Sequence, residues 1–184
     1  MSSGAIQASA FATTARLPAA ALWRRMACLA YEGLLLFGMA AIAGLSYAIL
    51  TDQRHAMQGR HGLQAVLFAV IGAYFGWFWS HGGQTVAMKA WRIRLVRTDG
   101  SPVSARRALC RYLLAWLWFA PALLALWSAE ATGSGPIFAA LCIGVIVYAA
   151  LTRLHPDRQF WHDAFCGTRL VDSRSELPAH NRRP

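Results

Sequence analysis

The sequence has little charge for its length. Only 14% of its 184 residues are charged and Asp and Glu together number 8, whereas 57% are apolar. A soluble domain of this size needs more charge to cover its surface, so the composition favours an integral membrane protein. The net charge of +10 does not indicate nucleic acid, because the basic residues lie between and beside apolar spans rather than on one soluble module. We expect the partner of these residues to be a bilayer with anionic headgroups, and no nucleic acid.

The sequence also lacks the motifs that carry common chemistry. It has no G-x-S-x-G, no H-E-x-x-H and no phosphate-binding glycine loop, which argues against an enzyme. Its four cysteines have no C-x-x-C spacing, so neither a disulfide framework nor a thiolate metal site is indicated. We therefore predict no enzymatic activity, no cofactor and no metal.

Long apolar stretches are what the sequence has in abundance. About 20 apolar residues in a helix cross a bilayer core of roughly 30 Å, and we predict transmembrane helices over about 26–50, 63–80, 112–129 and 136–152. The first run is far longer than the apolar region of a signal peptide, so we expect it to remain uncleaved. Trp77 and Trp79 end the second span as an expected interfacial pair.

The distribution of lysine and arginine predicts the orientation. All of them except Arg54 and Arg60 lie in the N-terminal segment, the 81–111 loop or the C-terminal segment. The positive-inside rule therefore places both termini and that loop in the cytoplasm. Residues 1–21 and 173–184 are expected to be disordered tails around a domain of residues 22–172.

The middle loop contains a strand-like pattern. Trp91, Ile93 and Leu95 alternate with arginines, and D-G-S-P follows as a turn. Residues 167–171 have similar character, so we expect the two segments to pair as a small cytoplasmic ribbon. The predicted fold class is an all-α membrane protein with four transmembrane helices, this β-ribbon and short interfacial helices, including a basic amphipathic lead-in over 99–112.

Glu32 is the one charge inside the first span. A carboxylate there costs roughly 2.5–3.5 kcal/mol on insertion scales, so it needs a partner or a function. Arg25 lies seven residues away, on the same helix face but too far for a direct pair, and Arg107 or Arg111 are the first candidate partners. Glu32 is either a paired carboxylate that locks helix packing or one that titrates or binds a cation; a third reading is a residue that snorkels or stays protonated beside lipid.

Gly72 and Gly76 form a G-x-x-x-G motif in the second span. Small residues one turn apart allow two helix backbones to approach closely. The motif predicts either packing within the chain or a self-association face.

Three blocks of residues resemble the RDD family of bacterial membrane proteins. They are R-R-M-A-C-L-A-Y-E in the first span, G-Q-T-V-A-M-K-A-W-R-I-R-L-V-R-T-D-G with the following R-A-L-C-R-Y-L, and R-Q-F-W-H-D-A-F-C-G-T-R-L-V. By this resemblance, Arg25 takes the place of the family's arginine and Asp163 that of one aspartate, while Glu32 stands where the other aspartate belongs. Met88 departs from the Gly-Lys turn of the family. The resemblance implies a bacterial inner membrane and a role that is largely undefined, with transport of unidentified ligands suggested.

Two classes of function follow. In the first, Arg25, Glu32, Arg111 and Asp163 form an intramembrane polar site of a transport component, with Lys89, Arg107 and His162 as accessory residues. Four spans enclose little volume, so we expect such a protein to act as a homo-oligomer. In the second, the same residues lock the packing of a non-transporting scaffold or assembly partner. His162 and Asp163 are adjacent and point about 100° apart on a helix, so we expect them not to pair with each other.

Overall fold

The computed structural model describes residues 3–52, 60–116, 119, 124, 134–154 and 159–176. In chain order its elements are α1 (Ser3–Ala15), α2 (Leu22–Leu50), α3 (Arg60–Ser80), α4 (Val86–Ala90), β1 (Ile93–Arg97), α5 (Ala105–Ala115), α7 (Ser134–Leu151), α8 (Trp161–Phe165) and β2 (Thr168–Asp172). Short 3-10 helices cover Thr152–Leu154 and Ser173–Glu176.

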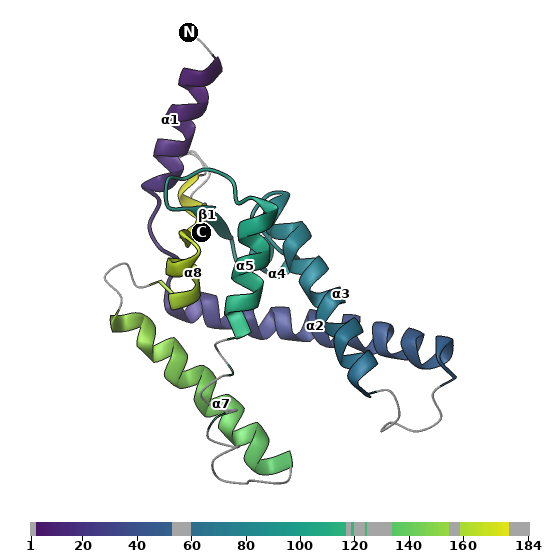
Figure 1. Cartoon of the computed structure of the whole chain (residues 1–184). Helices are drawn as coiled ribbons and strands as arrows, with labels where there is room; N and C mark the ends of the chain where they lie inside the picture. The colour runs from purple at the N-terminus through teal and green to yellow at the C-terminus, as the bar shows by residue number, and fades with distance from the viewer. Residues whose placement is uncertain are drawn as a thin grey trace.

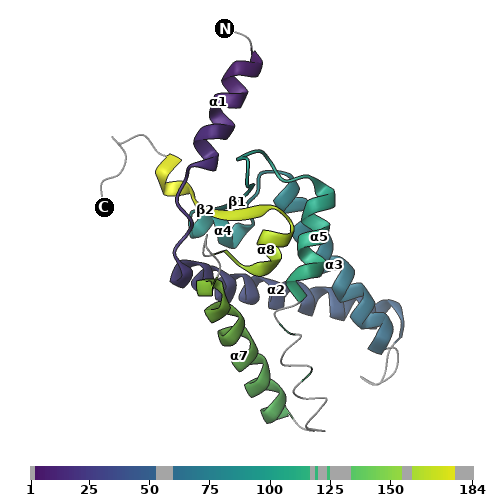
Figure 2. The ribbon, with the colours of Figure 1, turned by 60° about the vertical axis from the view of Figure 1, so that its left-hand side comes forward.

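The short elements gather at one end of the molecule. Figures 1 and 2 show α4, α5, α8 and the two strands together beside the first part of α2, while α7 and the far half of α3 extend away from them. The chain therefore has a mixed α/β end with most of the polar contacts and a set of long apolar helices.

Two described helices are long and apolar enough to cross a membrane. They are Leu22–Leu50 and His61–Ser80, and Gly135–Leu151 is a shorter apolar helix. The first two predicted spans are thus helices of suitable length and composition. The predicted third span, 112–129, lies mostly outside the described residues. Its first residues belong to α5, which ends at Ala115. Four membrane spans stay a prediction.

The predicted β-ribbon is confirmed. β1 and β2 pair antiparallel, with Ile93 opposite Asp172 and Arg97 opposite Thr168. Backbone bonds extend the ribbon on both sides: Leu95 N–H donates to the Gly83 carbonyl oxygen, and Ala20 N–H donates to the Leu170 carbonyl oxygen. β2 consequently has β1 along one edge and the segment before α2 along the other.

The turn that follows β1 requires a glycine. Gly100 has a φ of +81°, and a Cβ atom there would collide with the Phe11 carbonyl oxygen of α1. The predicted D-G-S-P turn is present, with Arg97 N–H donating to the Ser101 carbonyl oxygen at 3.0 Å. The turn lets α1 lie close to the ribbon.

Residues 3–15 form helix α1 where the sequence analysis expected a disordered tail. The alanines of this stretch have high helix propensity, which the tail prediction ignored. Arg169 of β2 satisfies the end of the helix, since its two terminal nitrogens donate to the carbonyl oxygens of Ala15 and Leu17 at 2.7 and 2.9 Å. A cation at a helix C-terminus also interacts favourably with the helix dipole.

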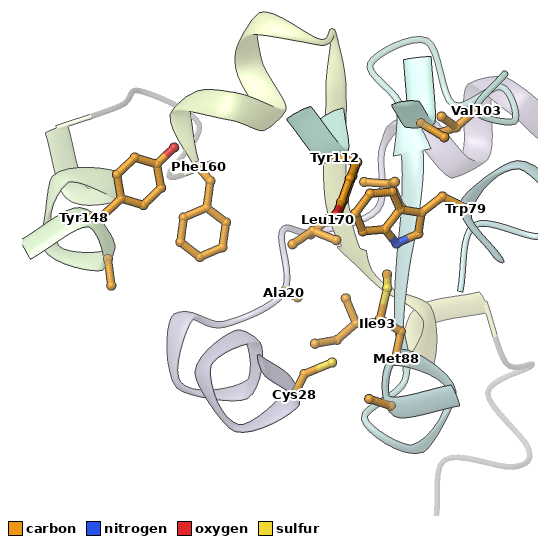
Figure 3. Close-up of a cluster of buried hydrophobic side chains, with 14 residues drawn as sticks. Ala20, Cys28, Trp79, Met88, Ile93, Val103, Tyr112, Tyr148, Phe160 and Leu170 are labelled. Atoms are coloured by element: carbon orange, nitrogen blue, oxygen red, sulfur yellow. The ribbon is translucent and has the colours of Figure 1, made fainter. Parts of the chain in front are cut away.

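The hydrophobic core is formed by the ribbon together with residues of helices α2, α3, α4, α5 and α7. Figure 3 shows Ile93 and Leu170 of the strands together with Cys28, Trp79 and Tyr112. Gly72 contributes to the α3–α5 contact, because a Cβ there would lie 2.9 Å from Tyr112 Cε1. Gly72 therefore packs within the chain, whereas no atom of the described residues lies within 4 Å of a Cβ built at Gly76.

Candidate functional site

Arg111 and Asp163 form a buried ion pair between α5 and α8. Arg111 Nε donates to Asp163 Oδ1 at 2.6 Å, and Asp163 is 0% exposed. From β2, the Thr168 hydroxyl donates to the backbone carbonyl oxygen of Asp163 at 3.2 Å, and it lies 3.5 Å from the carboxylate oxygen Oδ1. Breaking such a pair is costly, because the partner left behind is an uncompensated buried charge. The two predicted site residues therefore meet in the structure.

The face of α5 that carries Arg111 also carries Arg107, one turn earlier. Arg107 Nη1 donates to the Cys166 carbonyl oxygen at 2.9 Å, at the end of α8. Burial raises the pKa of the Cys166 thiol to about 12, helped by a hydrogen bond with Cys110 of α5. Arg107 thus holds α8 against α5 and acts one turn away from the ion pair.

His162 extends the network toward α7. Its Nδ1 lies 3.0 Å from the Tyr148 hydroxyl and its Nε2 lies 3.5 Å from Asp163 Oδ1. The expectation that His162 and Asp163 do not pair with each other was wrong, since their side-chain atoms come within 3.5 Å although the two residues are adjacent on α8. Burial lowers the pKa of His162 to about 4, so the ring is neutral at pH 7.

Glu32 is held by hydroxyl groups. Tyr74 of α3 donates to Glu32 Oε1 at 2.6 Å, Thr85 donates to Oε2, and Glu32 is 4% exposed. The expected partners Arg107 and Arg111 bind elsewhere, so that expectation was wrong. Within the part of the chain that the structure describes, Glu32 takes part in no ion pair.

Thr85 has a second role as the N-cap of α4. Its hydroxyl oxygen accepts from the backbone N–H of Met88 at 3.2 Å, as threonine does at helix starts. Met88 is buried and continues the helix, so this departure from the family pattern leaves α4 formed. The sequence analysis missed both Thr85 and Tyr74. Two features of the sequence could have identified them: the hydroxyl of Tyr74 lies on an apolar span, and Thr85 directly precedes a short helix.

Arg25 approaches the cluster from α2. Its guanidinium carbon lies 5.0 Å from the centre of the Phe160 ring, a cation–π distance, and its charge interacts with that of Asp163. Arg25, Arg111 and Asp163 are therefore brought together as predicted, and Glu32 lies two helical turns along α2.

The adjacent Arg24 was missed by the sequence analysis. It donates to the Asp172 carboxylate and to the backbone carbonyl oxygen of Trp91, and at 3.2 Å to that of Arg92. Arg92 has a φ of +52°, an uncommon conformation for a residue other than glycine. Successive residues on a helix point about 100° apart. Two neighbouring arginines are therefore expected to contact different partners. Arg24 ties the start of α2 to the ribbon.

Trp79 is buried rather than interfacial. It is 5% exposed and its ring lies 4.1 Å from the Arg111 guanidinium carbon. Trp77 is 62% exposed and stacks on His81 at 4.0 Å, so only Trp77 fits the expected interfacial position. Lys89 is exposed on α4, and among the described residues no hydrogen bond or ion pair joins it to the cluster.

A cavity of about 560 Å³ lies beside these polar groups. Arg25, Glu32, Arg111 and His162 line it together with apolar side chains of α2, α3, α5 and α7. This volume falls within the range of small-molecule sites, about 300–1,000 Å³. Among the described residues no group of three or more His, Cys, Asp or Glu side chains could hold a metal ion. The arrangement suits a small, mostly apolar molecule with one polar end.

Comparison with known proteins shows the family to which the chain belongs. No curated protein and no solved structure matches the chain. The model of the RDD family matches residues 19–167, which include Arg25, Glu32, Arg111, Asp163 and the cavity-lining helices. The match covers most of the 184 residues, and the chain belongs to the RDD family.

Proposed function

We propose that this RDD family protein is a multi-pass membrane protein that carries an ion or a small ligand through its cavity. The observation that carries the proposal is the placement of Glu32, Arg25 and Arg111 on the wall of one cavity of about 560 Å³. Charged side chains within apolar helices are costly and mark ligand or ion pathways.

Glu32 is the residue on which we expect transport to depend. Its partners among the described residues are the hydroxyl groups of Tyr74 and Thr85, and a hydroxyl can both donate and accept hydrogen bonds. Tyr74 and Thr85 can therefore accommodate the carboxylate with or without a proton or bound cation. Arginine offers no such freedom, since it has donors only.

We further propose that the protein lies in the bacterial inner membrane with both termini in the cytoplasm. The distribution of lysine and arginine supports this orientation. The mixed α/β end, which contains Arg24, Arg94 and Arg97, would then face the cytoplasm and its anionic headgroups.

A second candidate is a non-transporting scaffold. The observation that favours it is the closed arrangement around Asp163, where Arg111 is both ion-paired at 2.6 Å and stacked on Trp79 at 4.1 Å. In that case the polar cluster fixes helix packing and the protein moves nothing.

The substitution Glu32→Gln separates the two functions, because it keeps the shape and removes the charge. The purified protein is reconstituted in vesicles, and cation-linked proton flux is measured with a pH-sensitive dye. We expect Glu32→Gln to abolish flux while the protein stays folded, and the exposed Asp99→Asn to leave flux unchanged. Equal flux in wild type and Glu32→Gln, or no flux in the wild type, supports the scaffold instead.

Cysteine labelling tests the orientation. Cys110 is exposed on α5, whereas Cys166 is buried, so Cys110 is the position to probe. A variant that keeps only Cys110 should react with a membrane-impermeant maleimide after permeabilisation and not in intact cells. Labelling in intact cells contradicts the proposed orientation.

A further inference from the structure

Arg92, between α4 and β1, combines a strained backbone with an exposed side chain. Its φ of +52° lies in the left-handed region, where residues other than glycine are uncommon and cost free energy. The backbone is held there because the Arg92 carbonyl oxygen accepts from Arg24 Nη2 at 3.2 Å and from the Ser173 N–H at 3.0 Å. Among the residues that the structure describes, no carboxylate pairs with the Arg92 guanidinium. The fold thus uses the backbone of Arg92 and leaves its exposed charge available to a partner outside the chain.

Two more exposed basic residues start from the same place. The Arg92 N–H donates to the Lys89 carbonyl oxygen at 3.1 Å, and the residue after the one bonded to the Arg92 carbonyl oxygen is Arg174. Lys89 and Arg174 are both exposed. Asp172, the acid beside them, is already paired with Arg24. Three exposed positive charges therefore gather where the neighbouring acid is neutralised, and such a surface attracts an anion.

Two tryptophan rings border these charges. Trp91 directly precedes Arg92, and its ring meets that of Trp23 edge to face, with 6.0 Å between the ring centres. Trp23 is 64% exposed. Tryptophan is enriched where the polar and apolar parts of a bilayer meet, because its ring is apolar and its N–H is polar. A free inorganic anion has no use for these rings, so the anion is expected to carry an apolar part.

The apolar surface continues from Trp23 along α2. Ala30 and Leu34 follow Trp23 on the same face at helical spacing, and both are exposed. The helix itself is long and apolar enough to cross a membrane. An acyl chain below a headgroup held at the start of α2 would therefore lie along this face.

We propose that Trp23 and Trp91, together with Lys89, Arg92 and Arg174, form a binding site for one anionic phospholipid of the cytoplasmic leaflet. The basic side chains bind the headgroup phosphate, and the two rings cover the glycerol and the first part of the acyl chains. The inference rests on the proposed membrane location and orientation, but it does not depend on transport.

The test compares dioleoyl phosphatidylglycerol with dioleoyl phosphatidylcholine, which have the same acyl chains and differ in the charge of the headgroup. Binding of single lipids to the full chain is measured by native mass spectrometry in a neutral detergent. We expect the wild type to bind the anionic lipid about 10-fold more tightly, since each basic residue near the headgroup contributes about 1 kcal/mol. Inorganic phosphate, added as its ammonium salt, should leave the amount of bound anionic lipid unchanged.

Arg92→Gln and Arg106→Gln are a matched pair, because both arginines are exposed and Arg106 lies on α5, beyond β1 in the chain. Arg92→Gln should weaken binding of the anionic lipid about 5-fold and leave phosphatidylcholine binding unchanged. Arg106→Gln should alter neither affinity.

A second substitution, Arg92→Gly, separates lipid binding from folding. Glycine adopts a positive φ without strain, so the melting temperature should not fall, whereas the affinity for the anionic lipid should fall as in Arg92→Gln. Trp23→Ala removes the exposed ring and should weaken both lipids by a similar factor.

Several results overturn the inference. They are equal affinity for the two lipids, equal effects of Arg92→Gln and Arg106→Gln, or unchanged lipid binding in Trp23→Ala. Displacement of the lipid by inorganic phosphate would assign the surface to a free phosphate instead. The wild-type comparison needs no variant to fold. Lipid affinity is measured in detergent without any flux, so its failure leaves the Glu32→Gln result intact, and failure of the transport proposal leaves the lipid site intact.

Discussion

Two buried carboxylates stand at the centre of this molecule, and their surroundings differ. Asp163, on the short helix α8, is paired with the guanidinium of Arg111 at 2.6 Å and is fully buried. Glu32, on the long apolar helix α2, accepts from the hydroxyl groups of Tyr74 and Thr85. Both lie within the region matched by the family model, yet one is compensated by a full charge and the other by neutral donors.

Under the proposed function, the difference assigns Asp163 to the packing of the helices and Glu32 to transport. A guanidinium remains charged at all physiological pH values and cannot accept a hydrogen bond, so the Asp163 pair has one stable arrangement. Hydroxyl groups can reverse their role, so the surroundings of Glu32 tolerate a change of charge. We therefore expect substitutions around Asp163 to affect stability and substitutions around Glu32 to affect transport first.

The largest expected effect is that of Arg111→Met, which leaves Asp163 as an unpaired buried charge. We expect a loss of about 3–5 kcal/mol in the free energy of unfolding, measured by denaturant titration in detergent. The double variant Arg111→Met with Asp163→Asn removes the charge as well and should recover most of this loss. A double variant as unstable as the single one shows that Asp163 does not depend on the pair.

The next effect concerns pH. The pKa of His162 is about 4 in the folded protein, against 6.5 when unperturbed. Between pH 6.5 and 4 the imidazole is therefore protonated in the unfolded chain and neutral in the folded protein. Stability is therefore fully present above pH 6.5 and falls as the pH decreases toward 4, by up to about 3 kcal/mol. Thermal unfolding in detergent across this range measures it.

The matched variant for the pH prediction is His162→Asn, whose amide can still reach the Tyr148 hydroxyl. Its stability should fall less steeply with decreasing pH than that of the wild type. Identical pH profiles for the two proteins exclude His162 as the group responsible.

A smaller effect is expected at the other acid. Tyr74→Phe removes one donor to the Glu32 carboxylate and should cost about 2 kcal/mol, as expected for a hydrogen bond to a charged group. Tyr112→Phe removes a bond of 2.8 Å to the neutral Phe68 carbonyl oxygen and should cost about 1 kcal/mol. Denaturant titrations of both proteins test the order, and a reversed order indicates that Glu32 is not ionised in the folded state.

The smallest effect is expected for Lys89→Gln. Lys89 is exposed on α4, so the change in stability should stay within about 0.5 kcal/mol and vesicle flux should be unchanged. A marked loss of flux would place Lys89 in the site after all and widen the region around Glu32.

Much of the fold followed from patterns in the sequence. The alternation at Trp91–Leu95 and the apolar character of residues 167–171 predicted the pairing of β1 with β2, because strand periodicity reports directly on which face is buried. The two longest apolar runs predicted α2 and α3 for the same reason. Helix α1 was missed, since its alanines carry propensity without an apolar face.

Three of the four residues proposed for the polar site lie together in the structure, but the partners expected for Glu32 were wrong. Arg25, Glu32, Arg111 and Asp163 were named because charges in or beside apolar helices are conspicuous. That Glu32 would be held by Tyr74 and Thr85 depends on how α3 and α4 lie against α2, and no spacing within the chain encodes that geometry. The burial of Trp79 likewise depends on Arg111 lying above its ring.

The position of β2 has a consequence for how the protein is made. This strand, from Thr168 to Asp172, lies between β1 and the segment before α2, so the middle of the sheet is synthesised after both of its neighbours. Until the ribosome has released residue 172, the start of α2 and the 93–97 segment have no common partner. The step that joins the first and last parts of the chain therefore comes after synthesis of every element that precedes β2.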